Sequence, residues 1–335
     1  MHRHTQPGVP MAHLELANLL MTNLLHSGIA LLWLLGLRRF AGPLAPTLWA
    51  DLLRICLGLP PALLLLRVLG LPQAPLAWRT LRVGRWTELA LDAGPLLLTA
   101  LVALLAGTLL LFVVQELRPA LLAWRDGVPR DALPDAQLQA DAESMLELLR
   151  NHNLVPSRGR PPEALHLPNE QPIAGLRGIV RPQVVASTGL LTMLDREERL
   201  ATLAHELAHW ARGGNLRLLL VWLLRSTQAV NPAALILFRE LVEAEELACD
   251  FLAARVTGRP AALASALLKA HGQPELQHNA GPLARAQAEV LRRAELSSVR
   301  ARVERLLRSP PQRVPHWAIT GGAVAVLVVL LWSVG

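Results

Sequence analysis

The sequence predicts a mainly α-helical integral membrane protein, with about four transmembrane helices and a more polar domain inserted before the last of them. Hydrophobic residues make up 52% of the 335 residues and charged residues only 18%, and the mean hydropathy is +0.34. This composition is too apolar for a typical soluble domain. The apolar residues also cluster into runs, and about 20 such residues in a helix cross a bilayer.

Two of these runs are clear transmembrane candidates. Residues 95–114 carry no charge, and residues 317–334 have tryptophans near both ends, as is typical of the membrane interface. A third run, residues 24–37, ends at Arg38 and Arg39, which indicate the stop of a retained anchor rather than a cleaved signal peptide.

A fourth run, residues 49–71, is interrupted by polar residues and prolines. Asp51, Arg54 and the pair Pro60-Pro61 lie within it. It could be a kinked span or a re-entrant segment. The number of spans before residue 115 is therefore two or three.

Arginine positions indicate the orientation and the kind of partner. Arginines precede the last run and no charge follows it, which predicts a cytoplasmic domain; they are Arg300, Arg302, Arg305, Arg308 and Arg313. Arg79, Arg82 and Arg85 oppose this topology if residues 95–114 cross, so we expect an interfacial helix there. The net charge of +7 comes without a basic stripe interleaved with aromatics, so we expect a lipid bilayer partner and no direct nucleic-acid contact.

Three regions follow: an N-terminal membrane region over residues 1–115, an inserted domain over 116–315, and a C-terminal transmembrane helix over 316–335. Within the inserted domain we expect, in order, a helix over 135–153, strands at 163–167 and 178–187, a helix opening at Asp195 with Glu197 and Glu198 in its first turn, and a helix over 284–308.

The segment ATLAHELAHWARGG, residues 201–214, puts two histidines and a glutamate on an otherwise apolar helix. His205 and His209 are four residues apart and share a helix face, so both imidazoles can meet one ion. Zinc takes such nitrogens, and Glu206 beside the first ligand can accept a proton from water. The alternative is a pair of packing or surface histidines on an amphipathic helix.

A third zinc ligand is expected from the segment RELVEAEELACDFLAAR, residues 239–255. Glu246 and Asp250 share a helix face, which suits one ligand and one carboxylate that orients a ligating histidine. Glu243 and Glu245 are expected to form a solvated acidic face.

Together, the motifs HELAH and EELACD resemble those of the bacterial BlaR/MecR-type antirepressor membrane zinc metallopeptidases and the related HtpX and CaaX-prenyl-protease group. The resemblance covers about residues 116–308 and includes VVASTGLLTMLDREERLATLAHELAHW and RARVERLLR. It implies a gluzincin-like zinc metallopeptidase domain of helices and a small β-sheet. It also implies one Zn²⁺ per chain held by His205, His209 and Glu246, with Glu206 as the base and Asp250 in support.

Two departures from that family concern the substrate. The active-site helix is often followed by an acidic residue, and here the run is Arg212-Gly213-Gly214-Asn215. The antibiotic-sensing members carry a penicillin-binding domain after the last span, whereas this sequence runs to Gly335, so we expect no direct β-lactam sensing.

The chain between the two motifs limits the topology. A zinc site needs both motifs on one side of the bilayer, and the apolar runs at 216–225 and 229–238 are each too short for a comfortable span. Membrane-lying helices with no crossing, or a shallow hairpin, both satisfy this condition.

The resulting hypothesis is a multi-pass zinc metalloendopeptidase of the bacterial inner membrane that cleaves protein or peptide substrates at the cytoplasmic face. An edge strand near residues 179–187 would align the extended substrate. The role would be regulatory cleavage of a transcriptional repressor or membrane protein quality control. The alternatives are an inactive membrane scaffold or receptor that keeps the peptidase fold and, less favoured, a transporter-like bundle.

Overall fold

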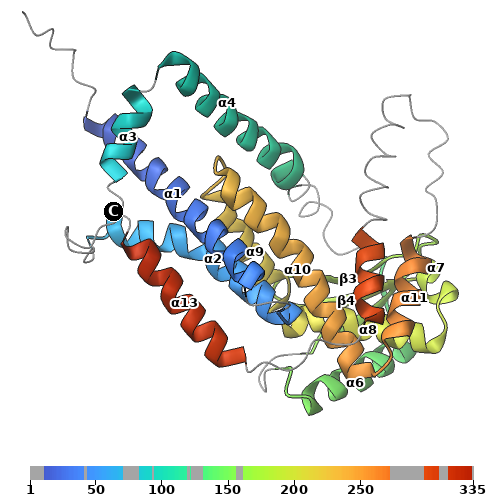
Figure 1. The fold of residues 1–335 in the computed structure, drawn as a ribbon. Coiled ribbons are helices and arrows are strands. Elements are labelled where there is room, and N and C mark those ends of the chain that lie inside the picture. Colours follow the sequence, from blue (N-terminus) through green and yellow to red (C-terminus); the bar gives the residue numbers. More distant parts are fainter. Residues whose placement is uncertain are drawn as a thin grey trace, which may run out of the picture. The chain divides into compact units, whose positions relative to one another are not determined.

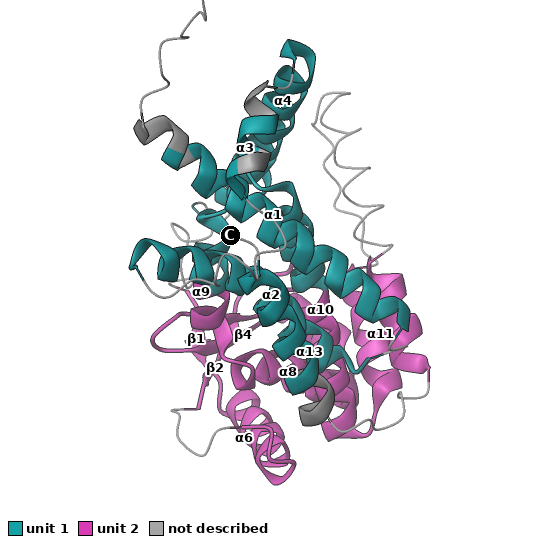
Figure 2. Cartoon of the chain, turned by 60° about the vertical axis from the view of Figure 1, so that its left-hand side comes forward, with its two compact units in different colours: residues 1–122, 221–243, 313–335 teal, residues 123–220, 244–312 magenta. Residues whose placement is uncertain are grey.

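The computed structural model describes residues 11–40, 44–70, 83–92, 94–118, 121, 131–155, 161–271, 298–308 and 316–333 (Figure 1). It is mainly helical with a small β-sheet, as the sequence predicts. The chain forms two compact units (Figure 2): unit 1 holds residues 1–122, 221–243 and 313–335, and unit 2 holds residues 123–220 and 244–312. Unit 1 thus takes in residues 221–243, which lie inside the expected region 116–315.

Unit 1 holds the membrane helices. Their bounds are α1 (Met11–Phe40), α2 (Pro46–Val68), α3 (Val83–Asp92), α4 (Pro95–Phe112), the π-helix η2 (Val113–Leu117) and α13 (His316–Trp332). Three stretches are long and apolar enough to cross a membrane, namely Ala17–Phe40, Pro46–Val68 and Pro95–Leu117. In α13 the apolar stretch is shorter, Gly321–Trp332, so a fourth crossing remains a prediction. The expected interfacial segment falls partly outside the described residues, since these resume at Val83.

Polar side chains hold the turn between α9 (Gly214–Ser226) and α10 (Pro232–Thr257) to the membrane helices of unit 1. The Gln228 side chain accepts hydrogen bonds from Asn23 at 3.3 Å and Ser27 at 3.0 Å, and donates to the Leu57 carbonyl oxygen at 3.0 Å. Asn231 donates to the Asn23 carboxamide oxygen at 2.7 Å. Because hydrocarbon offers no water to such groups, they must satisfy one another.

The end of the third span is held by a buried ion pair. Arg225, which is fully buried, lies 3.3 Å from the Glu116 carboxylate and donates to the Gln228 carbonyl oxygen at 2.6 Å. Its guanidinium also lies 5.2 Å from the centre of the Phe112 ring. The polar residues between the apolar runs 216–225 and 229–238 therefore help to hold the helices of unit 1 together.

Unit 2 is built on a four-stranded sheet among the described residues. Its strands are β1 (Leu133–Pro134), β2 (Glu163–Leu167), β3 (Ala174–Arg177) and β4 (Gln183–Ser187), in the order β1-β2-β4-β3. β2 and β4 pair in parallel, and the other pairs are antiparallel. The helices of unit 2 are α6 (Ala136–Asn151), α7 (Thr188–Met193), α8 (Arg196–Ala211), α11 (Pro260–His271), the adjoining parts of α9 and α10, and residues 298–307.

The core of unit 2 follows from the alternation of apolar residues along the strands. Ala164, Val184 and Ala186 pack against α6 and α8, whereas Leu165 and Val185 form a small cluster on the other face of the sheet. The helix that carries His205 and His209, α8, therefore packs in the core, and this packing fixes the direction of its polar side chains.

The expected strand over residues 178–187 is only partly correct. β4 begins at Gln183, and residues 178–182 form the loop that joins it to β3. β4 lies between β2 and β3, so it is an interior strand, and the prediction of an edge strand at 179–187 is wrong. The edge strand beside α8 is β3, which the small residues of Ala174-Gly175 did not reveal.

The start of α8 is fixed by a capping box. The Asp195 carboxylate accepts the Glu198 backbone N–H at 2.9 Å, and the Glu198 carboxylate accepts the Asp195 N–H at 2.9 Å. Buried Glu198 also accepts hydrogen bonds at 2.6 Å from Ser265 and from Lys269 of α11, and Lys269 is the only lysine in the chain. Burial alone would raise the pKa of Glu198, but these hydrogen bonds lower it overall.

Replacing Glu198 by alanine should lower the free energy of unfolding by about 2 kcal/mol, because the cap and two buried hydrogen bonds are lost together. Thermal unfolding of the full chain in detergent measures this loss. Glu197→Ala is the matched control, since its side chain is 58% exposed and pairs with Arg259 at the surface. That change should cost less than about 0.5 kcal/mol. Equal losses in the two variants would contradict the role given to Glu198.

The contribution of Glu198 should also depend on pH. Its pKa is lower in the folded chain than its ordinary value, so its stabilisation is present near neutral pH and is lost as the pH falls through the lowered pKa. The difference in melting temperature between the wild type and Glu198→Gln should therefore shrink in acid. A difference that widens as the pH falls would reject this linkage.

Candidate metal centre

His205 and His209 lie on one face of α8, as their four-residue spacing predicts. Their rings are 4.8 Å apart and nearly perpendicular, and their Nε2 atoms are 3.2 Å apart. His205 is buried, and His209 is half-buried. Two ring nitrogens at this distance repel each other unless a cation or a proton lies between them.

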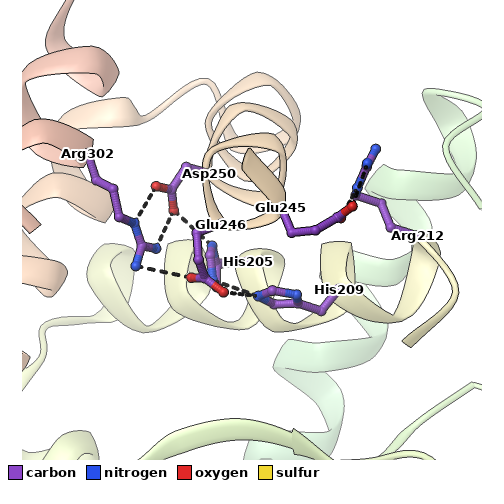
Figure 3. Close-up of polar contacts among 7 residues, drawn as sticks. All are labelled: His205, His209, Arg212, Glu245, Glu246, Asp250 and Arg302. Atoms are coloured by element: carbon purple, nitrogen blue, oxygen red, sulfur yellow. Dashed lines mark hydrogen bonds and ion pairs between the residues drawn. The ribbon is translucent and has the colours of Figure 1, made fainter. Parts of the chain in front are cut away.

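Glu246 of α10 brings a carboxylate to the same point (Figure 3). Its Oε1 atom lies 3.4 Å from His209 Nε2, and its Oε2 atom lies 3.7 Å from His205 Nε2. The three side chains form a group that could hold a metal ion, with one candidate ligand atom from each. The structure thus brings together the two histidines and the glutamate that the sequence selected.

Asp250 lies one turn further along α10 and contacts the other nitrogen of His205. The distance from Asp250 Oδ1 to His205 Nδ1 is 2.9 Å. Burial alone would raise the pKa of Asp250, but hydrogen bonds from Arg302 and His205 lower it to about 2. A charged carboxylate in this place holds a hydrogen on Nδ1 and leaves Nε2 with its lone pair directed at the centre.

Arg302 completes the cluster, although the sequence indicated for it only a part in the topology and none at the metal centre. It donates two hydrogen bonds of 2.7 Å to the two oxygens of Asp250, and it lies 3.1 Å from Oε2 of Glu246 (Figure 3). Its side chain is 12% exposed. One guanidinium therefore fixes both carboxylates that α10 contributes. In the sequence it was one of several arginines in a helix 52 residues after Asp250, and nothing distinguished it from the others.

Glu206 follows His205 on α8 and faces the edge strand. Its carboxylate accepts a hydrogen bond from the backbone N–H of Leu176 in β3. Burial raises the pKa of Glu206 above its ordinary value, with a further contribution from the negative charge of Glu246. A carboxylate with a raised pKa is a better proton acceptor than an ordinary glutamate.

Protonation of the two histidines differs. Burial and the neighbouring His205 lower the pKa of His209 to about 4. Burial would also lower the pKa of His205, but Asp250 reverses this and raises it. Near neutral pH His209 is therefore unprotonated, which is the form that ligates a metal.

The segment after α8 packs against the edge strand. Gly213 has φ +104°, and a Cβ atom there would lie 2.8 Å from the Arg217 side chain, so the turn requires glycine. Asn215 donates hydrogen bonds of 3.0 Å to the carbonyl oxygens of Leu176 and Gly178. The departure from the family pattern at residues 212–215 thus has a structural use in holding β3.

Glu243 and Glu245, the other two acids expected on a solvated face, differ in their exposure to solvent. Glu243 is exposed, as expected of a solvated face. Glu245 instead pairs with Arg212 at 3.0 Å, and both side chains are largely buried, so the expectation of a solvated Glu245 is wrong. This pair ties the end of α8 to α10.

The donor set fits zinc in type and spacing. Zinc bonds of about 2.0 to 2.1 Å in a tetrahedral arrangement place neighbouring ligand atoms about 3.4 Å apart. Here the two Nε2 atoms are 3.2 Å apart, and the two oxygens of Glu246 lie 3.4 Å from His209 Nε2 and 3.7 Å from His205 Nε2, respectively. Imidazole nitrogens and a carboxylate oxygen are zinc ligands, and Asp250 supplies the carboxylate that commonly orients a ligating histidine.

Arg302→Gln should weaken zinc binding by about tenfold or more, because Glu246 and Asp250 would lose the group that fixes them. It should also lower the free energy of unfolding by about 3 kcal/mol, since Asp250 would remain buried without its charge partner. Competition with a zinc chelator and thermal unfolding measure the two effects. Arg300→Gln is the control, because the Arg300 side chain is 82% exposed on the same helix. Unchanged zinc affinity in Arg302→Gln would refute the assignment.

Comparison with known proteins supports this chemistry. Residues 169–296 match the family model Peptidase_M56, described as BlaR1 peptidase M56. The matched segment is less than half of the chain, and it contains both motifs but not Arg302. No curated protein matches the chain. The match and the three apolar helices indicate a membrane-associated metallopeptidase. The resemblance of this chain to the BlaR/MecR-type membrane metallopeptidases is thereby confirmed over residues 169–296.

Proposed function

We propose that this chain is a membrane-bound zinc endopeptidase, with His205, His209 and Glu246 as its zinc ligands. The observation that carries the proposal is the convergence of two imidazole nitrogens, 3.2 Å apart, with the carboxylate of Glu246, which allows one ligand atom from each residue within 4.8 Å of the others. A purely structural histidine pair would not need a carboxylate from a second helix at that spacing. The stoichiometry would be one Zn²⁺ per chain.

Glu206 acts as the general base in this proposal. When bound, zinc lowers the pKa of a water molecule and polarises the scissile carbonyl group. Glu206 accepts a proton from the attacking water and then delivers it to the leaving amine. The same residue thus serves as base and as acid, and no second proton donor is required. Its raised pKa supports both steps, since the carboxylate must take up the proton and release it again.

Asp250 and Arg302 are positioning residues. Asp250 holds the Nδ1 hydrogen of His205, and Arg302 fixes Asp250 and Glu246 relative to each other. Neither needs to touch the substrate. Together they hold the ligand atoms in place, so little reorganisation is required when the ion binds.

The edge strand β3 is the proposed substrate-binding strand. In the antiparallel pair of β3 and β4, the Ser187 N–H donates a hydrogen bond of 2.9 Å to the Ile173 oxygen. Hydrogen-bonded residues alternate along such a strand, so the backbone groups of Ile173, Gly175 and Arg177 face β4. Ala174 and Leu176 therefore direct their backbone groups away from β4. Leu176 is already engaged by Glu206 and Asn215, so an extended peptide would pair with Ala174.

The site of action and the biological role are further parts of the proposal. The arginines before α13 support a cytoplasmic peptidase, and the BlaR1-type match supports regulatory cleavage of a protein such as a repressor. Quality control of membrane proteins is the other role compatible with the same site. Induction by envelope stress would favour quality control, and a repressor encoded next to this protein would favour signalling.

Glu206→Gln should abolish proteolysis while the fold and the bound zinc are retained, because only the proton acceptor is removed. The assay is the release of fluorescence from labelled casein by the zinc-loaded full chain in vesicles. Zinc content and melting temperature of the variant serve as controls. A casein cleavage rate in Glu206→Gln equal to that of the wild type would show that Glu206 is not the base. A wild type that neither binds zinc when zinc is supplied nor cleaves casein would instead support an inactive scaffold.

A further inference from the structure

We propose that unit 2 carries a lipid-facing surface that docks on an anionic bilayer leaflet. The surface consists of the tip of the β3–β4 loop, Ile179 and Val180, and the first turns of α9, Leu216, Leu218 and Leu220. All five residues belong to unit 2. Arginines border the apolar residues, and their partners are the lipid phosphates.

The β3–β4 loop presents its apolar residues outward. Val180 is 91% exposed and Ile179 is 41% exposed. Gly178 has φ +77°, and a Cβ atom there would lie 2.3 Å from the Arg181 carbonyl oxygen, so the loop closes tightly. Because unit 2 covers little of Val180 and only part of Ile179, the two side chains present a compact apolar tip.

The first turns of α9 expose leucines on more than one side of the helix. Leu216, Leu218 and Leu220 are 51%, 53% and 53% exposed. Residues at i and i+4 share a helix face, while i+2 lies nearly opposite, so no single face of α9 is polar here. Arg217 is the one charged residue in these turns, and clustered exposed leucines mark a surface that protein or lipid covers.

A side-chain clamp joins the loop and the helix into one surface. Asn215 at the start of α9 donates hydrogen bonds of 3.0 Å to the carbonyl oxygens of Leu176 and Gly178. Gly214 lies beside the Leu176 side chain, where a Cβ atom would be at 3.4 Å. The loop tip and the leucines of α9 are therefore parts of the same rigid region.

The charges of this region favour lipid over a second copy of the chain. Arg177, Arg181 and Arg217 are exposed beside the apolar residues, and neither Arg177 nor Arg181 forms an ion pair with any residue that the structure describes. Two copies meeting through this surface would oppose their arginines, whereas lipid phosphates complement them. From residue 221 α9 belongs to unit 1, which holds three candidate spans, so this helix is continuous in sequence with the membrane unit.

One consequence rests on the proposed function. β3 carries both the loop tip and the backbone groups that face Glu206. If the tip enters the headgroup layer, the strand that receives the peptide lies close to the membrane surface. The substrate would then be an extended segment next to a membrane anchor, which, of the two roles proposed above, favours quality control of membrane proteins over cleavage of a soluble repressor.

The test is quenching by lipid of a probe at Val180. A bimane label on Val180→Cys, in the full chain reconstituted in phosphatidylcholine and phosphatidylglycerol vesicles, is exposed to lipids with a nitroxide on a shallow acyl carbon. Leu97→Cys on α4 is the positive control, and Ser144→Cys on α6 is the negative control, since both residues are exposed. The native Cys56 and Cys249 are buried, and the wild type measures their background labelling.

We expect quenching at Val180 close to that at Leu97, and none above background at Ser144. Arg177→Gln with Arg181→Gln should reduce quenching at Val180 and leave Leu97 unchanged. Quenching at Val180 no greater than at Ser144 would overturn the proposal, and energy transfer between labelled copies would then assign the surface to self-association. Because no readout depends on proteolysis, failure here leaves the proposed zinc chemistry intact, and an inactive enzyme leaves this surface testable.

Discussion

The convergence of His205, His209 and Glu246 is the constraint on which the rest of unit 2 depends. The two Nε2 lone pairs are 3.2 Å apart, one oxygen of Glu246 lies 3.4 Å from His209 and the other lies 3.7 Å from His205, and such groups repel unless a cation lies among them. The surrounding structure holds them there nevertheless. The capping box and Glu198 fix the start of α8, the Arg212–Glu245 pair ties its end to α10, and Arg302 restrains the two acids of α10. Because the ligand side chains are already held in position, little side-chain freedom is lost when an ion binds.

The second feature is the continuity of the site with the membrane unit. α8 is followed by α9, and the turn from α9 to α10 is held in unit 1 by buried polar side chains and the Arg225–Glu116 pair. The same α10 then supplies Glu246 and Asp250 to unit 2. Of the two helices that bear the ligands, α10 therefore begins in unit 1 and ends in unit 2, whereas α8 lies within unit 2. The proposed endopeptidase is therefore suited to substrates that come to it at a membrane.

Much of the site could be predicted from the sequence because its key contacts repeat within a helix. His205 and His209, and again Glu246 and Asp250, are related by four residues, and helical geometry alone puts each pair on one face. The segment 163–167 was predicted as a short β-prone run, and Asp195 with the acids of the first turn indicated the start of α8. Arg302 and β3 were missed for a physical reason. The contacts of Arg302 span 52 residues, and Ala174-Gly175 lacks the branched residues typical of strands. The edge-strand assignment failed because apolar residues in 183–187 indicate a strand but not its position in the sheet.

The coordination of zinc in the loaded full chain tests the central claim most directly. Metal analysis combined with X-ray absorption at the zinc edge should give one ion per chain, with two imidazole nitrogens and a carboxylate oxygen at about 2.0 to 2.1 Å. Glu246→Ala should lose the ion, whereas Glu243→Ala, at an exposed acid of the same helix, should keep the ion and its spectrum. Zinc retained in Glu246→Ala with an unchanged spectrum would contradict the account.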